Sequence, residues 1–128
     1  MPSARIDVRR PRADHEVQAI IEAVYLAQRD ALKVPENDRH ILYTEHRPER
    51  FSLPPGTSDN YTHIEITLFP GRSLAAKKNL YTGIIRRLGE LGIAADDIFI
   101  ILTEPPLQNW AIHGRAASEV ELGFDLNV

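Results

Sequence analysis

The sequence predicts a single α+β domain made of two successive β-α-β units, which form one four-stranded mixed sheet with both helices on one face. Strand-like apolar segments alternate with helix-like segments twice along the chain. Related residues recur about 59 positions apart, and a length of 128 residues suits one domain. We therefore assign units 2–57 and 61–128 to a single domain, residues 1–128.

The first unit begins with a short apolar strand at residues 6–8. Helical spacing follows from about Asp14 to Lys33, and Asp14 and Glu16 suit a first turn, where the helix dipole favours negative charge. A proline-containing breaker at residues 34–38 ends this helix, and residues 41–44 form the next expected strand.

The second unit repeats this order. Residues 64–69 form a strand, Ser73 is the expected N-cap of a helix, and residues 98–102 form a fourth strand. Residues 48–60, rich in Pro, Gly and Ser, link the units. Residues 120–126 alternate between apolar and polar side chains and predict an additional C-terminal strand.

The duplication is visible in polar residues as well as apolar ones. At a constant shift of 59 the pairs are Val34 and Ile93, Asp38 and Asp97, Thr44-Glu45 and Thr103-Glu104, and Phe51 and Trp110. Arg12 matches Arg72 at a shift of 60, so one residue of slack is expected in a loop. Two unrelated β-α-β units would share apolar positions, but not this set of polar ones.

Each crossover returns its second strand parallel to the first. Both helices then cover one face, whereas the strand at residues 98–102, which we expect to be central in the sheet, is apolar on both sides. We expect other subunits to cover the second face.

Composition excludes several function classes. A net charge of -3 and a pI of about 5.9 disfavour binding to nucleic acid or to an anionic membrane. The absence of cysteine excludes disulfides and thiol chemistry, and the five histidines have no metal-ligand spacing, so we expect no metal and no cofactor. No signal peptide or membrane span is expected, which favours a cytoplasmic location.

Four motifs then carry a family resemblance: Pro2 directly after the initiator Met, the corner at residues 34–39, the Gly71-Arg72-Ser73 turn, and Glu104 followed by Trp110. In their order and spacing they resemble the tautomerase superfamily, in particular its long-chain members of the malonate semialdehyde decarboxylase type and uncharacterised tautomerase-like proteins. The resemblance implies a homotrimer whose catalytic group is the amine of the N-terminal proline, exposed when Met1 is removed.

The chemistry of that amine is simple. A free α-amine titrates near about 7.7–8.0, and burial or a nearby cation lowers its pKa. Such an amine acts as a general base when neutral and as a general acid when charged. Proline directly after Met1 is also compatible with an ordinary chain start, so Pro2 indicates this chemistry only in combination with the duplicated β-α-β fold.

The resemblance also implies roles for four further residues. Arg72 would bind the substrate carboxylate, with Arg39 and Trp110 as further substrate-binding residues. Asp38 would orient water or hold the proline ammonium, although its counterpart Asp97 suggests a purely structural alternative. Strand alternation sends Arg39 and its neighbour His40 to opposite sides, so at most one of them reaches the same pocket.

The sequence departs from the decarboxylase pattern at one point. That pattern has two arginines separated by one residue after the third strand, whereas this chain has only Arg72 there, with Phe69 in a position where charge is expected. The candidates for a second cation are Arg39, Arg47 and Arg115.

We therefore expect an enzyme, a tautomerase or isomerase, that transfers a proton on a small 2-oxo or enol carboxylate. One alternative is a decarboxylase or hydratase of a 3-oxo or unsaturated acid that uses the same proline. Another is a non-catalytic trimeric protein.

Overall fold

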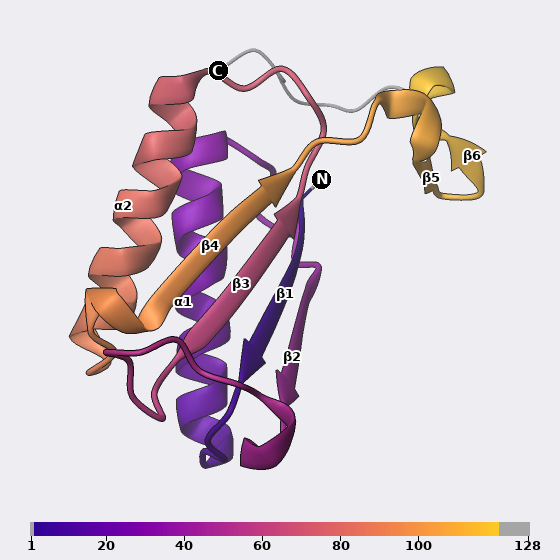
Figure 1. The fold of residues 1–128 in the computed structure, drawn as a ribbon. Coiled ribbons are helices and arrows are strands. Elements are labelled where there is room, and N and C mark those ends of the chain that lie inside the picture. Colours follow the sequence, from indigo (N-terminus) through magenta and orange to yellow (C-terminus); the bar gives the residue numbers. More distant parts are fainter. Residues whose placement is uncertain (1, 121–128) are drawn as a thin grey trace.

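The computed structural model describes residues 2–120 and confirms the predicted α+β architecture (Figure 1). Four strands form one sheet in the order β2-β1-β3-β4, and two long helices cover one face of it (Figure 1). The elements are β1 (Ser3–Val8), α1 (Asp14–Leu32), β2 (Ile41–Glu45), β3 (Thr62–Thr67), α2 (Leu74–Glu90) and β4 (Ile98–Thr103). Within these residues no helix is long and apolar enough to cross a membrane.

Strand directions determine which ends of the chain meet. β1 runs parallel to β2 and antiparallel to β3, which runs parallel to β4. One edge of the sheet therefore holds the beginnings of β1 and β2 and the ends of β3 and β4. We call it the amino-terminal edge. The other edge, where β1 and β2 end and β3 and β4 begin, we call the opposite edge.

The two units repeat in strand register as well as in sequence. Ala4 pairs with Ile41 in the first unit, and Ile64 pairs with Ile100 in the second. Ala4 corresponds to Ile64 at a shift of 60, and Ile41 corresponds to Ile100 at a shift of 59. Since α1 has 19 residues and α2 has 17, the slack expected from the sequence lies where the helices end.

A continuous apolar core lies between the sheet and the helices. Alternate residues of β1 and β3 point into it and are 0–1% exposed, and the matching stripes of both helices are buried as well. Burial of this surface supplies the main favourable free energy of folding. The members at equivalent positions are Ala4 and Ile64, Ile6 and Ile66, Val8 and Leu68, Ile20 and Leu80, and Val24 and Ile84.

The uncovered face of the sheet differs from the sequence-based expectation. β4 is an edge strand, and only there does the outer face carry exposed large apolar side chains in succession, Phe99 and Ile101. In the middle of the sheet Arg5 stands opposite Glu65. The strand that we expected to be central is therefore peripheral, and the open face is mixed in polarity.

The chain after β4 leaves the main body as an arm (Figure 1). It contains the two-residue strands β5 (Ala111–Ile112) and β6 (Arg115–Ala116), which pair antiparallel and which the sequence did not predict. The arm folds onto itself, since the amide of Ala117 donates to the carbonyl of Trp110 at 2.9 Å. Of the predicted strand at residues 120–126, only residue 120 is among the described residues.

The duplicated helix starts provide a matched test of stability. Ser73 Oγ accepts from the amide of Ala76 at 3.1 Å, whereas its counterpart Ala13 has the same extended backbone and no capping side chain. We expect Ser73→Ala to lower the free energy of unfolding by about 1 kcal/mol and Ala13→Ser to raise it by a similar or smaller amount. Urea denaturation of both variants measures the pair, and equal signs would contradict the assignment of these caps.

Candidate active site

The amino-terminal edge gathers residues from three distant parts of the sequence. Pro2 is buried and lies directly before β1, while Asp38 lies shortly before β2. Phe69 and Arg72 follow β3, whose last residue, Thr67, pairs with Ser3. Because β1 and β3 are antiparallel, the beginning of one and the end of the other meet here.

Arg72 is fixed by the turn that joins β3 to α2. Gly71 has a φ of 124°, a conformation that residues with a Cβ rarely adopt, and it lets the chain reverse before the helix. Arg72 is 6% exposed, and its Nη1 donates to the carbonyl of Phe69 at 3.2 Å. A cation at a helix N-terminus opposes the helix dipole, so this position needs negative charge nearby.

Asp38 supplies a carboxyl group in the same region. The side chain is 7% exposed, and burial raises the pKa of Asp38, because burial disfavours the ionised form. The positive charges of the amino terminus, His40 and Arg72 act in the opposite direction and lower this pKa. The carboxyl of Asp38 therefore lies within electrostatic range of both the amino terminus and Arg72.

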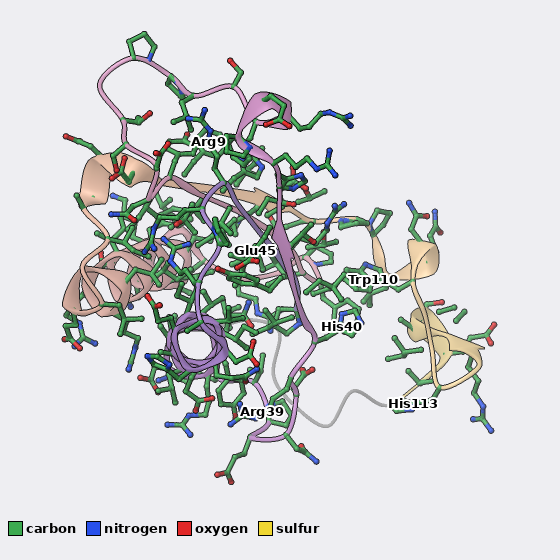
Figure 2. All side chains as sticks on the ribbon, turned by 90° about the horizontal axis from the view of Figure 1, so that it is seen from below. Arg9, Arg39, His40, Glu45, Trp110 and His113 are labelled. Atoms are coloured by element: carbon green, nitrogen blue, oxygen red, sulfur yellow. The ribbon has the colours of Figure 1, made fainter. Side chains whose placement is uncertain are left out.

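His40 and Arg39 separate as strand alternation predicts, and His40 is the one that faces the candidate site. His40 Nδ1 lies 2.8 Å from Ser3 Oγ, and its carbonyl accepts from the amide of Ala4. Arg39 instead donates to Glu22 at 2.7 Å, and its guanidinium lies 3.7 Å from the centre of the Tyr25 ring. The two side chains lie apart in Figure 2.

An aromatic pair borders Arg72. Trp110 meets the fully buried Phe69 edge to face, with ring centroids 4.6 Å apart and an angle of 69°. Trp110 Nε1 donates to the carbonyl of Pro105 at 3.1 Å, which fixes the indole (Figure 2 shows where Trp110 lies). This contact suits the substrate-binding role that the resemblance implies for Trp110, and that role stays a prediction.

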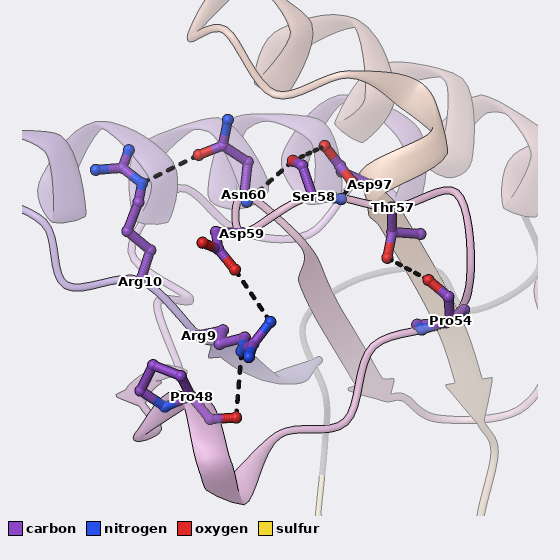
Figure 3. A network of polar contacts seen from close by, with 9 residues as sticks. All are labelled: Arg9, Arg10, Pro48, Pro54, Thr57, Ser58, Asp59, Asn60 and Asp97. Carbon is purple, nitrogen blue, oxygen red and sulfur yellow. Dashed lines mark hydrogen bonds and ion pairs between the residues drawn. The ribbon is translucent and has the colours of Figure 1, made fainter.

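Asp97 shows what the duplicated aspartate does where no chain end is present. It is 6% exposed and accepts from the amide of Ser58 at 2.7 Å and from Ser58 Oγ at 2.6 Å (Figure 3). It therefore holds the chain that leads into β3 and is not a local cap of its own turn. By the repeat, Asp38 takes the corresponding place relative to Pro2, which directly precedes β1.

The structure thus brings Pro2, Asp38, Arg72 and Trp110 to one edge and leaves Arg39 outside the group. The sequence did not single out Phe69 as a packing partner, and it left open whether Arg39 or His40 reaches the site. The apolar pair Leu68-Phe69 at the end of the strand could have indicated the first, although strict alternation would place Phe69 on the uncovered face, and no local pattern indicates a contact between Ser3 and His40. Among residues 2–120 no group of three or more His, Asp or Glu side chains could hold a metal ion.

Comparisons with known proteins agree with one another. A protein-family model described as "Tautomerase enzyme" matches residues 38–113. The probable tautomerase YusQ of Bacillus subtilis (strain 168) is 26% identical over 127 residues, covering 94% of this chain and 100% of that protein.

Solved structures show a similar fold. A malonate semialdehyde decarboxylase matches with a TM-score of 0.82 and 28% identity, covering 89% of this chain and 93% of that one. The native fused 4-OT matches with a TM-score of 0.83 and 17% identity, covering 91% of this chain and 96% of that one.

Replacement of aspartate by asparagine should have opposite effects on stability at Asp38 and at Asp97. Folding raises the pKa of Asp38, so its carboxyl contributes stability that is present below about pH 3.8 and is lost as the pH rises through the folded-state pKa. Asp38→Asn cannot ionise and should raise the thermal midpoint at pH 7, with the gain disappearing toward pH 3.8.

Asp97→Asn is the matched control. It weakens two charge-assisted hydrogen bonds from Ser58 and should lower the free energy of unfolding at pH 7 by about 1–3 kcal/mol. Calorimetry from pH 3.5 to pH 8 measures both variants. Destabilisation of Asp38→Asn at neutral pH would show that the carboxylate form of Asp38 stabilises the fold.

Proposed function

The chain belongs to the tautomerase superfamily, and we propose that it is an enzyme that transfers a proton on a small 2-oxo or enol carboxylate through the amine of Pro2. The observation that carries this proposal is the convergence of three groups on one edge. Buried Pro2 precedes β1, while the carboxyl of Asp38 lies in electrostatic range of the amino terminus and of Arg72. These groups can supply a proton carrier, an assisting carboxylate and a cation for the substrate.

The proposed reaction assigns each group one task. Arg72 binds the substrate carboxylate, since a guanidinium matches a carboxylate bidentately. The neutral amine of Pro2 removes the enol proton, and the resulting ammonium returns a proton to the neighbouring carbon, which leaves the ketone and regenerates the amine. Asp38 stabilises the ammonium between these two steps, and Trp110 with Phe69 limits access of water beside Arg72.

We extend the proposal to a homotrimer. The fused 4-OT is described as a trimer in two solved structures, which share this fold at TM-scores of 0.81 but are 19% and 21% identical. The exposed apolar side chains on the uncovered face, Leu42, Phe99 and Ile101, are 43–53% exposed in the single chain. Contact with neighbouring subunits would remove this surface from water.

A decarboxylase or hydratase is the second candidate. It is favoured by the likeness to malonate semialdehyde decarboxylase, whose solved structure is described as a basis for decarboxylase and hydratase activities. In that case the amine works in its charged form, and together with Arg72 it stabilises the developing enolate. Release of carbon dioxide from 3-oxo acids, or hydration of an acetylenic acid, distinguishes these activities from ketonisation of an enol.

The role of the proline is tested by substitution. A general acid or base contributes about 10²–10⁴ in rate, so Pro2→Ala should lower kcat/KM for the ketonisation of phenylenolpyruvate by at least about 100-fold. Mass spectrometry of both proteins must first show that Met1 is absent, because an amide nitrogen cannot carry the proton. An unimpaired Pro2→Ala enzyme would refute the proline mechanism, and retention of Met1 in cells would favour the non-catalytic alternative.

A pair of arginine variants tests substrate binding. Arg72→Gln should raise KM by about 10–100-fold, the loss expected when charged hydrogen bonds are removed. Arg39→Gln should leave KM nearly unchanged, because Glu22 already holds that guanidinium. Steady-state kinetics on the same enol measures both, and the reverse outcome would assign the carboxylate to Arg39 in place of Arg72.

A further inference from the structure

The duplication places a counterpart of the candidate site at the opposite edge of the sheet. Arg12 follows β1 as Arg72 follows β3, at the shift of 60 that relates the two units. Asp97 and the entry to β3 occupy the places that Asp38 and the entry to β1 occupy at the amino-terminal edge. The opposite edge therefore repeats the arrangement of arginine and aspartate. It has no amine to carry a proton, because β3 begins inside the chain.

A cavity of about 200 Å³ lies at this opposite edge. Its wall combines two guanidinium groups, an amide, His15 and the carboxylate of Glu16 with apolar side chains from α1 and from the segment that follows α2. This combination of polar and apolar wall is typical of sites for small organic ligands. The lining residues that matter here are Arg10, Arg12, Asn60, Ile20 and Ile93.

Two guanidinium groups in this wall converge on one neutral oxygen. Arg10 Nε donates to Asn60 Oδ1 at 3.1 Å, as Figure 3 shows, and Arg12 Nη2 donates to the same oxygen at 3.4 Å. Arg12 Nη1 also donates to a neutral group, the hydroxyl of Tyr43, at 3.4 Å. The amide oxygen cannot neutralise two positive charges, so the pair attracts an anion.

The carboxylates around this wall are largely engaged elsewhere. Glu45 accepts from the backbone amide of Arg12 at 2.9 Å, and Asp59 pairs with Arg9 at 3.0 Å (Figure 3). Glu16, which itself lines the cavity, forms a long ion pair with Arg10 at 3.9 Å and accepts from the amide of Ala13 at 3.3 Å. Across residues 2–120 the guanidinium of Arg12 forms no ion pair within 4.0 Å.

We propose that this cavity is a second, non-catalytic site for small carboxylates with a short apolar body. Arg10 and Arg12 bind the carboxylate, and the apolar end packs against Ile20 and Ile93. The site is separate from the proposed function, because it uses none of the groups at the amino-terminal edge and needs no free amine.

The probe is 3-phenylpropanoate, a saturated acid that carries no enol or ketone to react. Titration of the full chain is followed by amide NMR shifts. We expect saturable shifts at Asn60, Gly92 and Ile93, which remain when Arg72→Gln removes any shifts at Gly71. The absence of saturable shifts at Gly92 and Ile93 in the unsubstituted protein would overturn the proposal.

Asn60→Asp is the decisive variant. It places a carboxylate of nearly the same shape between the two guanidinium groups, so it should weaken probe binding at this edge by about tenfold or more without loss of thermal stability. Asp59→Asn, which changes the adjacent charge that faces Arg9, should leave the affinity unchanged.

Two results would contradict the assignment. Undiminished binding by Asn60→Asp would show that the guanidinium pair does not hold the carboxylate. Equal affinity for inorganic phosphate, measured by the same shifts, would show a site for simple anions in which the apolar wall plays no part.

Discussion

The antiparallel pairing of β1 with β3 is the constraint on which the candidate site depends. It joins the two β-α-β units through Ser3 opposite Thr67 and so brings the start of the chain beside the end of β3. Pro2 thereby lies at the same edge as the turn that carries Arg72, although seventy positions separate them in the sequence. Had the central strands paired parallel, these two residues would lie at opposite edges of the sheet.

The same pairing makes the two edges of the sheet related but unequal. Each edge has an aspartate before a strand and an arginine before a helix, because both units fold by the same pattern. The aspartate Asp97 accepts hydrogen bonds from Ser58 of the continuous chain, whereas the pKa of Asp38 is lowered by the charge of the amino terminus and raised by burial. Only the first unit begins at the amino terminus, so the proposed proton carrier belongs to one edge alone, and for the other edge we propose binding only.

Regular elements could be read from the sequence because their periodicity is local. Both helices, all four strands and the cap at Ser73 follow from apolar spacing and residue type. The position of β4 at the rim could not be inferred, because a strand that is apolar on both sides looks alike in the middle of a sheet and at an intersubunit edge. The β5–β6 hairpin escaped prediction because strands of two residues have no detectable period.

The site was predictable where it depends on topology and less so where it depends on single side-chain contacts. Alternation showed that Arg39 and His40 diverge, but only the contact with Glu22, seventeen positions away, shows which one leaves the edge. Likewise, the repeat indicated that Asp97 matches Asp38, yet its partner Ser58 lies in a linker without a repeat pattern. Such choices are decided by tertiary packing, which residue spacing does not encode.

The central claim is that the Pro2 amine, Asp38 and Arg72 interact at one edge. The most direct measurement is an NMR titration of the Pro2 amine in the Met1-cleaved protein and in Asp38→Asn and Arg72→Gln. A nearby carboxylate favours the ammonium and a nearby guanidinium disfavours it. The account predicts that Asp38→Asn lowers the pKa of the amine and that Arg72→Gln raises it, whereas an amine pKa unchanged in both variants would contradict the account.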